Sequence, residues 1–449
     1  MANKKRRKTI ALWGYGRYGK ALLKRIQAYW RARCCVIAVF DSSVNEGEEK
    51  LLEGGIPLMN PSKALEKYQQ GAFEAIVISV VNDHQYKEIE RIVQSLEIPI
   101  TTLIARDELC PMESFASVSE HDLPYGFKVH EYESVNGFYV PLYSWETHLF
   151  LFDDDGHGLL DNWFTDSFWV DATAFNPAFP FDSNVAPSVD LLGEYCAVSR
   201  TWGMNYWHFT YQFLDQIALM ERIGFKGTYL LPHAPFAIEL LGLANIGNDR
   251  VLWLDDLDDT MLYRFEKVLV LSQENYCFEQ SAPLLIDIAN TIRGNAVKLS
   301  DNNTSYPSRL FVKRVSSRRL LGVEDLLDAY GFQTIVPEDL TVTKQILYFM
   351  HADIVLSPHG ANSTNSLFMR PGAVLIETFG RGWVTPCCVE TLYLSGVHYL
   401  PVVETPIYNG LNVSPHADYK VRRSALEMAI KSAIQLVGEE VIRDACKMP

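Results

Sequence analysis

The chain has 449 residues, of which 48% are apolar and 21% charged, and its formal net charge is −15. This length exceeds that of one ordinary hydrophobic core and predicts two or three domains. The negative charge argues against nucleic-acid binding, which needs a basic surface to neutralise phosphates. A charged substrate would therefore have to meet a local cluster of cationic side chains.

One basic run, Lys4 to Lys8, stands near the start of the chain, and no apolar segment typical of a secretory signal follows it. The sequence has no unbroken apolar run of about 18 residues that could span a membrane. Its eight cysteines are scattered without metal-ligand spacing, which is typical of reduced thiols. We therefore expect a cytoplasmic protein whose basic run is either a solvated tail or a weak attachment to anionic lipids at the inner membrane face.

The first segment alternates between apolar runs and amphipathic helical patterns. Strands are predicted at 8–14, 34–41, 74–80 and 98–104, and helices at 17–32, 61–70 and 84–97. Such alternation indicates a doubly wound parallel sheet. We expect a Rossmann-like domain over residues 1–110.

Three glycines in this domain form a dinucleotide-binding fingerprint. Gly14, Gly16 and Gly19 follow the first strand and open the first helix, and Asp41 ends the second strand. The pattern predicts that the module binds NAD or another nucleotide, and the alternative is a module without a ligand. It also raises an alternative function as an NAD(P)-dependent oxidoreductase, although the remaining chain shows no constellation for hydride transfer.

Two further domains are predicted after residue 110. Residues 111–279 begin with irregular, aromatic-rich sequence and continue with a helix at 205–224 and strands at 227–232 and 267–272. In residues 280–449 the α/β alternation returns, with helices at 283–294, 323–331, 341–352, 362–369 and 424–442, and strands at 309–314, 332–336, 353–358 and 373–379.

The segment from Ser357 to Asn362, SPHGAN, is a sharp bend between a buried strand and a helix. In parallel α/β units, ligands bind at the carboxyl ends of strands. Gly360 permits close backbone approach, and Asn362 and the two residues after it are competent N-caps. A helix start here would favour an anion such as a diphosphate, to which His359 can donate. The alternative is a tight turn with a structural histidine.

Basic residues and a carboxylate accompany this bend in the sequence. Arg314 ends a predicted strand, and its guanidinium suits a phosphate because its donors form a planar fork. Arg318 and Arg319 are either part of the same site or solvated loop charges. Glu377 ends another predicted strand, where a carboxylate can accept from ribose hydroxyls or form an ion pair.

The run from Arg309 to Glu377 resembles the carboxy-terminal lobe of glycosyltransferase family 61. It contains the strand RLFVKR, the step GF…PE, the phrase HGA, the helix and turn TNSLFMRPG, and the strand end LIE. Upstream, NYWHFTYQFLDQI at 205–217 and LLP at 230–232 are similar to the family's other lobe. The resemblance covers roughly residues 190–380. Asn362 is a departure, because the family usually has a second glycine there.

The resemblance implies an α/β fold of the GT-B type, with two Rossmann-like lobes at 111–279 and 280–449 behind the additional Rossmann-like domain. It implies inverting, metal-independent transfer from a UDP-sugar to a saccharide or lipid-linked saccharide in bacterial capsule or lipopolysaccharide synthesis. The alternative is a non-catalytic scaffold of a polysaccharide assembly complex. The residues expected to bind the nucleotide sugar are Asn205, Arg314, Arg318, His359, Gly360, Ala361, Asn362, Asn365 and Glu377.

Inversion needs a base that takes the proton of the acceptor hydroxyl. His208, in the sequence NYWH, is the candidate base, because imidazole titrates near neutral pH. Its alternatives are a structural hydrogen bond or a contact with the donor. Asp215 lies two helical turns later and is expected to orient His208 or to replace it. Asp153 and Asp155 resemble a metal-binding carboxylate pair, but no further ligand set accompanies them, so we expect no metal.

Overall fold

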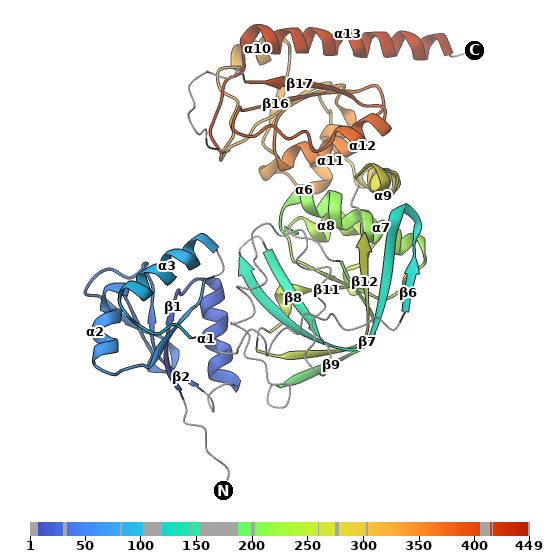
Figure 1. Cartoon of the computed structure of the whole chain (residues 1–449). Coiled ribbons are helices and arrows are strands. Elements are labelled where there is room, and N and C mark those ends of the chain that lie inside the picture. The colour runs from blue at the N-terminus through green and yellow to red at the C-terminus, as the bar shows by residue number, and fades with distance from the viewer. Residues whose placement is uncertain are drawn as a thin grey trace.

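The structure is a computed structural model, and it describes residues 8–29, 34–80, 83–101, 119–143, 146–152, 187–198, 203–258, 260–273, 278–301, 304–404, 414 and 416–447. Three sheets with their helices follow one another along the chain (Figure 1). The α/β fold class is thereby confirmed. The basic residues before Lys8 and the pair Asp153 and Asp155 lie outside the described residues.

The amino-terminal sheet has the strand order β3-β4-β2-β1-β5, in which β4, β2, β1 and β5 are parallel and β3 is an antiparallel edge. Its strands are apolar and largely buried in the centre, as expected for a sheet covered on both faces. The strands are β1 (Lys8–Trp13), β2 (Cys34–Phe40), β3 (Glu49–Leu51), β4 (Pro57–Met59) and β5 (Ala75–Ile78). The helices are α1 (Arg17–Tyr29), η1 (Glu53–Gly55), η2 (Pro61–Lys63), α2 (Ala64–Gln69) and α3 (Asp83–Ser95).

The middle sheet is mixed. Strands β11, β10, β9 and β12 are parallel, and β7 extends the sheet antiparallel to β12 and also pairs with β6 and β8. Part of the region that the sequence presents as irregular therefore consists of long antiparallel strands. The strands are β6 (Ser119–Asp122), β7 (Phe127–Tyr143), β8 (Glu146–Phe152), β9 (Ser188–Ala197), β10 (Thr228–Leu231), β11 (Val251–Trp253) and β12 (Leu262–Gln273).

One edge of the middle sheet carries helices that face the third sheet (Figure 1). The predicted helix at 205–224 consists of α6, a wider π turn and α7. The helices of this lobe are η3 (Pro124–Gly126), α6 (Tyr206–His208), the π turn η5 (Phe209–Phe213), α7 (Leu214–Arg222), α8 (Ala237–Leu243), η6 (Asn248–Arg250) and η7 (Leu254–Asp256).

The carboxy-terminal sheet is entirely parallel, with the order β14-β13-β15-β16-β17. The chain leaves β13 toward one edge and continues from β15 toward the other, so the gap between β13 and β15 is a topological switch point. The strands are β13 (Arg309–Val312), β14 (Gln333–Ile335), β15 (Ile354–Pro358), β16 (Val374–Phe379) and β17 (His398–Val403). The helices are α10 (Glu324–Ala329), η8 (Pro337–Asp339), α11 (Val342–His351), η9 (Ala361–Phe368), α12 (Val389–Leu394) and α13 (Arg423–Lys447).

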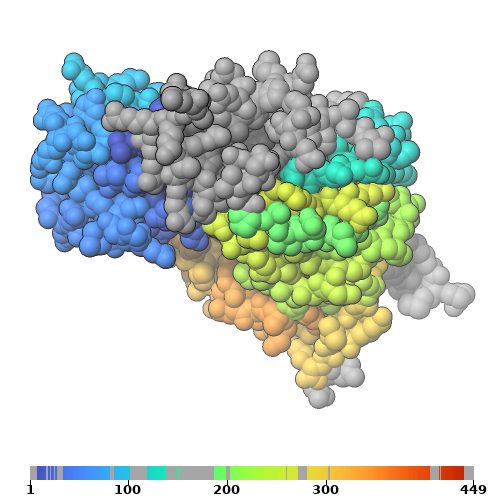
Figure 2. Space-filling model, turned by 90° about the horizontal axis from the view of Figure 1, so that it is seen from below, coloured from blue at the N-terminus to red at the C-terminus, as the bar shows by residue number. Residues whose placement is uncertain are grey.

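A single hydrophobic core joins the middle and carboxy-terminal lobes. It contains Leu214 of α7, Leu285 of the connecting helix α9 (Phe278–Lys298), Ile346 of α11 and Leu375 of β16. Figure 1 shows these helices stacked between the two sheets. The amino-terminal lobe lies beside the middle lobe (Figure 2) and contacts it through α1 and β7. Within the described chain, no helix combines the length and the apolar character needed to cross a membrane.

Candidate functional site

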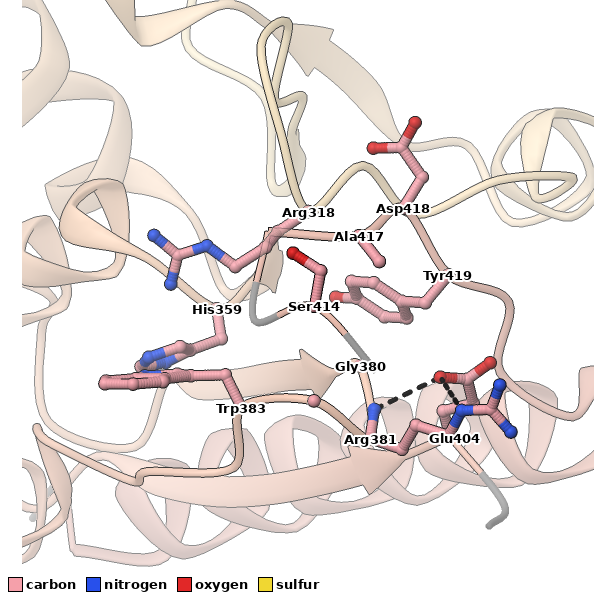
Figure 3. A pocket seen from close by; sticks show the side chains of 11 residues that line it. Arg318, His359, Gly380, Arg381, Trp383, Glu404, Ser414, Ala417, Asp418 and Tyr419 are labelled. Atoms are coloured by element: carbon pink, nitrogen blue, oxygen red, sulfur yellow. Dashed lines mark hydrogen bonds and ion pairs between the residues drawn. The ribbon is translucent and has the colours of Figure 1, made fainter. Parts of the chain in front are cut away.

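A pocket opens where strands β15 and β16 end (Figure 3). The residues that follow these strands line it, together with the loop after β13 and the segment before α13. This is the carboxyl edge of a parallel sheet beside its switch point, which is where such sheets bind ligands. The lining consists of Arg318, His359, Gly380, Arg381, Gly382, Trp383, Glu404, Ser414, Ala417, Asp418 and Tyr419.

Arg314 and Gly360 meet in direct contact next to this pocket. A Cβ atom at Gly360 would stand 1.8 Å from Nη1 of Arg314, so only glycine leaves room for the guanidinium. The Nε of Arg314 donates to the carbonyl oxygen of Ser317 at 2.7 Å, which fixes the side chain against its own loop. Burial, and then the positive charge of Arg318, lower the pKa of Arg314. The structure thus brings together two residues that the sequence predicted for one site.

Arg318 is held in an unusual state. Its φ of 55° lies in the left-handed region, which costs a non-glycine residue on the order of 1–3 kcal/mol. Its Nε is buried and has no hydrogen-bond partner among the described residues. Burial lowers the pKa of Arg318, because the charged form loses hydration. A strained backbone and an unsatisfied charged donor together indicate a site that is completed by an anion.

The other charges of the pocket do not neutralise these two arginines. Among the described residues, no carboxylate forms an ion pair with Arg314 or Arg318, whereas Arg319 pairs with Asp418 and Arg381 with Glu404. The stretch 405–413, which lies outside the described residues, contains no Asp or Glu. The pocket therefore concentrates positive charge in a strongly acidic chain.

His359 is oriented by a buried carboxylate. Its Nδ1 lies 2.9 Å from Oε1 of Glu377, and the hydroxyl of Tyr399 donates to Oε2 of Glu377 at 2.8 Å. Glu377 is only 1% exposed. Phe379 stacks on the imidazole with ring centroids 4.9 Å apart. Both oxygens of Glu377 are thus engaged inside the protein, which differs from the predicted contact with a ribose.

The helix after the bend begins at Ala361, one residue earlier than the sequence suggests. Gly360 is its N-cap, and no side chain caps this end. Asn362 lies inside the helix, where its side chain donates to Glu338 at 3.2 Å, and its φ is not positive. The departure from glycine at this position therefore places no strain on the backbone.

Two asparagines predicted to bind the donor form hydrogen bonds within the scaffold. Asn365 is fully buried, accepts from the hydroxyl of Tyr206 at 2.8 Å and donates to Gln345 at 3.0 Å. The side chain of Asn205 accepts from the backbone N–H of Trp207 at 2.9 Å and so caps α6. The first residue joins the two lobes, and the second fixes the start of the helix that carries His208.

His208 is partly buried at the lobe interface, on a helix that contacts η9. Its Nδ1 lies 2.7 Å from Oε1 of Gln212. Asp215 is fully buried, and its Oδ1 accepts from the N–H of Gln216 at 2.7 Å. The π turn between His208 and Asp215 is wider than an α turn, so the shared helix face predicted from α-helical spacing is not kept.

Several pocket residues had not been identified from the sequence. Trp383 is 48% exposed at the pocket, Glu404 follows β17 directly, and the hydroxyl of Tyr419 donates to the carbonyl of Thr378 at 2.7 Å. The GRGW sequence after β16 was a usable signal, because it follows a strand end. Tyr419 was not predictable, since a bridge between Leu320 and Tyr419 brings it there from far along the chain.

Two of the three glycines in the glycine-rich turn of the amino-terminal lobe are required by its local geometry. Gly14 has a φ of 110°, and a Cβ at Gly19 would stand 2.1 Å from the carbonyl oxygen of Gly14. A Cβ at Gly16 would meet no atom within 4 Å. The carboxylate of Asp41 accepts from the N–H of Tyr15 at 2.5 Å and of Ser43 at 2.9 Å, so it stabilises the turn itself. Whether this turn holds NAD or another nucleotide stays a prediction.

No group of three or more His, Cys, Asp or Glu side chains is placed to hold a metal ion in the part of the chain that the structure describes.

Comparison with known proteins identifies one segment. Residues 206–376 match the family model described as Glycosyltransferase 61, which confirms the resemblance found in the sequence. No curated protein matches the chain. A chain of the metal-soaked Flv1 flavodiiron core from Synechocystis sp. PCC6803 is 9% identical, with 91% of this chain and 81% of that chain covered and a TM-score of 0.21, too low to support an argument.

Proposed function

We propose that this chain, whose residues 206–376 belong to glycosyltransferase family 61, moves a sugar from a UDP-sugar to a saccharide acceptor with inversion and without a metal ion. The observation that supports a nucleotide-sugar donor most directly is the cationic pocket around Arg318 at the switch point of the carboxy-terminal sheet. The family match supports glycosyl transfer, and the positive charge of the pocket supports the binding of a charged donor there.

A diphosphate can accept hydrogen bonds from guanidinium groups at the pocket that have no carboxylate partner among the described residues. Arg314 and Arg318 offer guanidinium donors without carboxylate partners among the described residues, and η9 begins beside them without a side-chain cap. Charge-assisted hydrogen bonds from arginine to phosphate are roughly twice as strong as neutral ones. As the bond from the sugar to the diphosphate breaks, negative charge develops on the leaving oxygen, and fixed cations stabilise that charge.

His208 is the proposed base. In the tautomer whose Nδ1 donates to Gln212, Nε2 carries the lone pair that would take the proton of the acceptor hydroxyl. The hydroxyl oxygen then attacks the anomeric carbon on the face opposite the diphosphate, which inverts the configuration. Glu377 and Asp215 are both buried, so neither is assigned a contact with the substrate.

The family resemblance also supports a role in bacterial capsule or lipopolysaccharide synthesis. In that role the acceptor would be a saccharide or a lipid-linked saccharide at the inner face of the membrane. The basic run Lys4 to Lys8 would favour peripheral binding there.

A panel of nucleotide sugars, screened by the shift in melting temperature, tests the donor site, because a ligand that binds only the native state raises that temperature. We expect a UDP-sugar to stabilise the chain, and Arg314→Ala or Arg318→Ala to weaken its binding by about 10- to 100-fold, the loss of one charged hydrogen bond. Arg423→Ala is the matched control, since Arg423 forms an exposed ion pair with Asp325 and neither residue lines the pocket. A chain that no nucleotide sugar stabilises would contradict the proposal.

The base requires a separate test. His208→Ala should keep UDP-sugar binding but lose transfer or hydrolysis, as measured by release of UDP. Equal UDP release by His208→Ala and the unaltered chain would exclude His208 as the base.

A further inference from the structure

We propose that Glu377 is a positioning residue that enables His359 to take up a proton when the donor diphosphate binds. The inference rests on the proposed function, because it concerns how that pocket receives its anion. It gives Glu377 a role that its position at the end of a strand does not suggest, namely control of the charge on the neighbouring imidazole.

The hydrogen-bond pattern fixes one nitrogen of the imidazole. In the proposed arrangement Glu377 is the acceptor, and Nδ1 of His359 carries the hydrogen that the two groups share. Burial, and then the negative charge of Glu377, raise the pKa of Tyr399, which therefore stays a hydroxyl donor to the second oxygen. With Nδ1 and both carboxylate oxygens fixed, Nε2 of His359 is the atom whose protonation can change.

The imidazole lies on the pocket side of this arrangement. His359 lines the pocket and is 7% exposed, whereas Glu377 behind it is 1% exposed. The backbone N–H of His359 donates to Thr378 at 2.8 Å, and Phe379 stacks on the ring. Figure 3 shows His359 on the same side of the pocket as Arg318 and Trp383. Because Nδ1 faces Glu377, Nε2 is the ring nitrogen that we assign to a ligand in the pocket, and the stacking leaves the ring little freedom to turn.

Opposing charges decide whether Nε2 is protonated. Arg318 in the pocket and Arg314 on the neighbouring Gly360 oppose a further positive charge, whereas Glu377 favours it. The remaining charged groups at the pocket are paired, Asp418 with Arg319 and Glu404 with Arg381, while Tyr419 bonds to Thr378. A diphosphate neutralises the arginines and accepts from Nε2–H, so its arrival shifts this balance toward the imidazolium.

The imidazolium then assists departure of the diphosphate without a net proton transfer. The bond between the anomeric carbon and the phosphate oxygen breaks, and its electron pair goes to that oxygen. The Nε2–H hydrogen bond to the diphosphate strengthens as this charge develops, while the proton of the acceptor goes to the separate base.

Isothermal titration of the full chain tests this coupling, with the best-binding UDP-sugar of the panel as the probe. Its diphosphate keeps the same charge from about pH 6 to about pH 8.5, so a pH dependence reports on the protein. Titrations in buffers of different ionisation enthalpy count the protons taken up. We expect proton uptake by the unaltered chain and an affinity that falls about tenfold over this range.

The isosteric variant Glu377→Gln should bind more weakly near pH 6 and lose most of the proton uptake and of the pH dependence. His359→Gln, which keeps a neutral donor at the pocket, should bind without proton uptake. Arg423→Ala should behave like the unaltered chain, because Arg423 pairs with Asp325 and neither residue lines the pocket.

Two results would overturn the inference: proton uptake that Glu377→Gln leaves unchanged although binding weakens, or no proton uptake by the unaltered chain. If Glu377→Gln does not fold, His359→Gln decides, because unchanged proton uptake in that variant also overturns the inference. Absence of any UDP-sugar binding is a different outcome, which refutes the proposed function itself.

Discussion

A neighbouring side chain, and not the backbone torsions of residue 360, requires glycine at this position. The guanidinium of Arg314 occupies the space where a side chain would begin, and Gly360 is otherwise an extended residue. The HGA phrase and the arginine after β13 are therefore two halves of one packing arrangement. Considered alone, neither the HGA phrase nor the arginine explains why glycine is required.

Gly360→Ala should displace this guanidinium while it leaves the fold intact, because the obstructing atom is the end of a flexible side chain. We expect UDP-sugar affinity to fall about 10-fold or more, as for loss of one charge-assisted hydrogen bond, with little change in melting temperature. Gly294→Ala is the control, since a Cβ there meets no atom within 4 Å in helix α9. That change should raise stability by up to about 1 kcal/mol and leave binding unaltered.

At the residue scale, the sequence predicted which residue types gather near the bend but not which way they face. Arg314, Arg318 and His359 lie at or beside one pocket, as their positions after strands suggested. Glu377 also stands near a strand end, yet all six residues of β16 are buried, so its carboxylate is enclosed. The direction of a side chain depends on packing partners such as Tyr399, which a strand pattern does not reveal.

At the element scale, prediction succeeded where the pattern is local. The expected strands at 353–358 and 373–379 and the expected helix at 341–352 coincide closely with Ile354–Pro358, Val374–Phe379 and Val342–His351. The hairpins around β7 were missed, because the apolar residues Val129, Tyr132 and Val135 are three positions apart instead of two, and the pair Asn136-Gly137, which is typical of a turn, lies inside the strand. The π turn at Phe209–Phe213 was missed as well, since apolar spacing does not distinguish it from an α turn.

Helix α11 depends on a side chain from another lobe. The carboxylate of Glu239 in α8 accepts from the backbone N–H groups of Val342 and Thr343 at 2.9 and 2.8 Å, and from the hydroxyl of Thr343 at 2.6 Å. Glu239→Ala should therefore lower the free energy of unfolding by about 1.5–3 kcal/mol, as for loss of hydrogen bonds to a charged group. Urea unfolding followed by circular dichroism measures this change.

Glu239→Gln keeps the length of the side chain and one acceptor oxygen, so we expect a smaller loss than in Glu239→Ala. Equal stability of all three proteins would show that these bonds contribute nothing to the union of the two lobes.

At the scale of the whole molecule, one core cluster spans the middle and carboxy-terminal lobes in addition to a cluster within each of them, whereas the described cluster of the amino-terminal lobe contains no residue of the other two. Hydrogen exchange followed by mass spectrometry should therefore show α7 and α11 opening together, although they belong to different lobes. The strands of the amino-terminal sheet should open independently of both. Exchange of α11 in a step that leaves α7 protected would contradict the shared core.

The pocket extends beyond the segment that matches the family model. The family match ends at residue 376, whereas Trp383, Glu404 and Tyr419 come later in the chain and form much of the pocket wall. The residues of this wall can therefore change during evolution while the segment that matches the family model is kept. For engineering of the proposed donor site, residues 380–419 are the natural unit to exchange between relatives, and any truncation near residue 376 would remove most of the pocket lining.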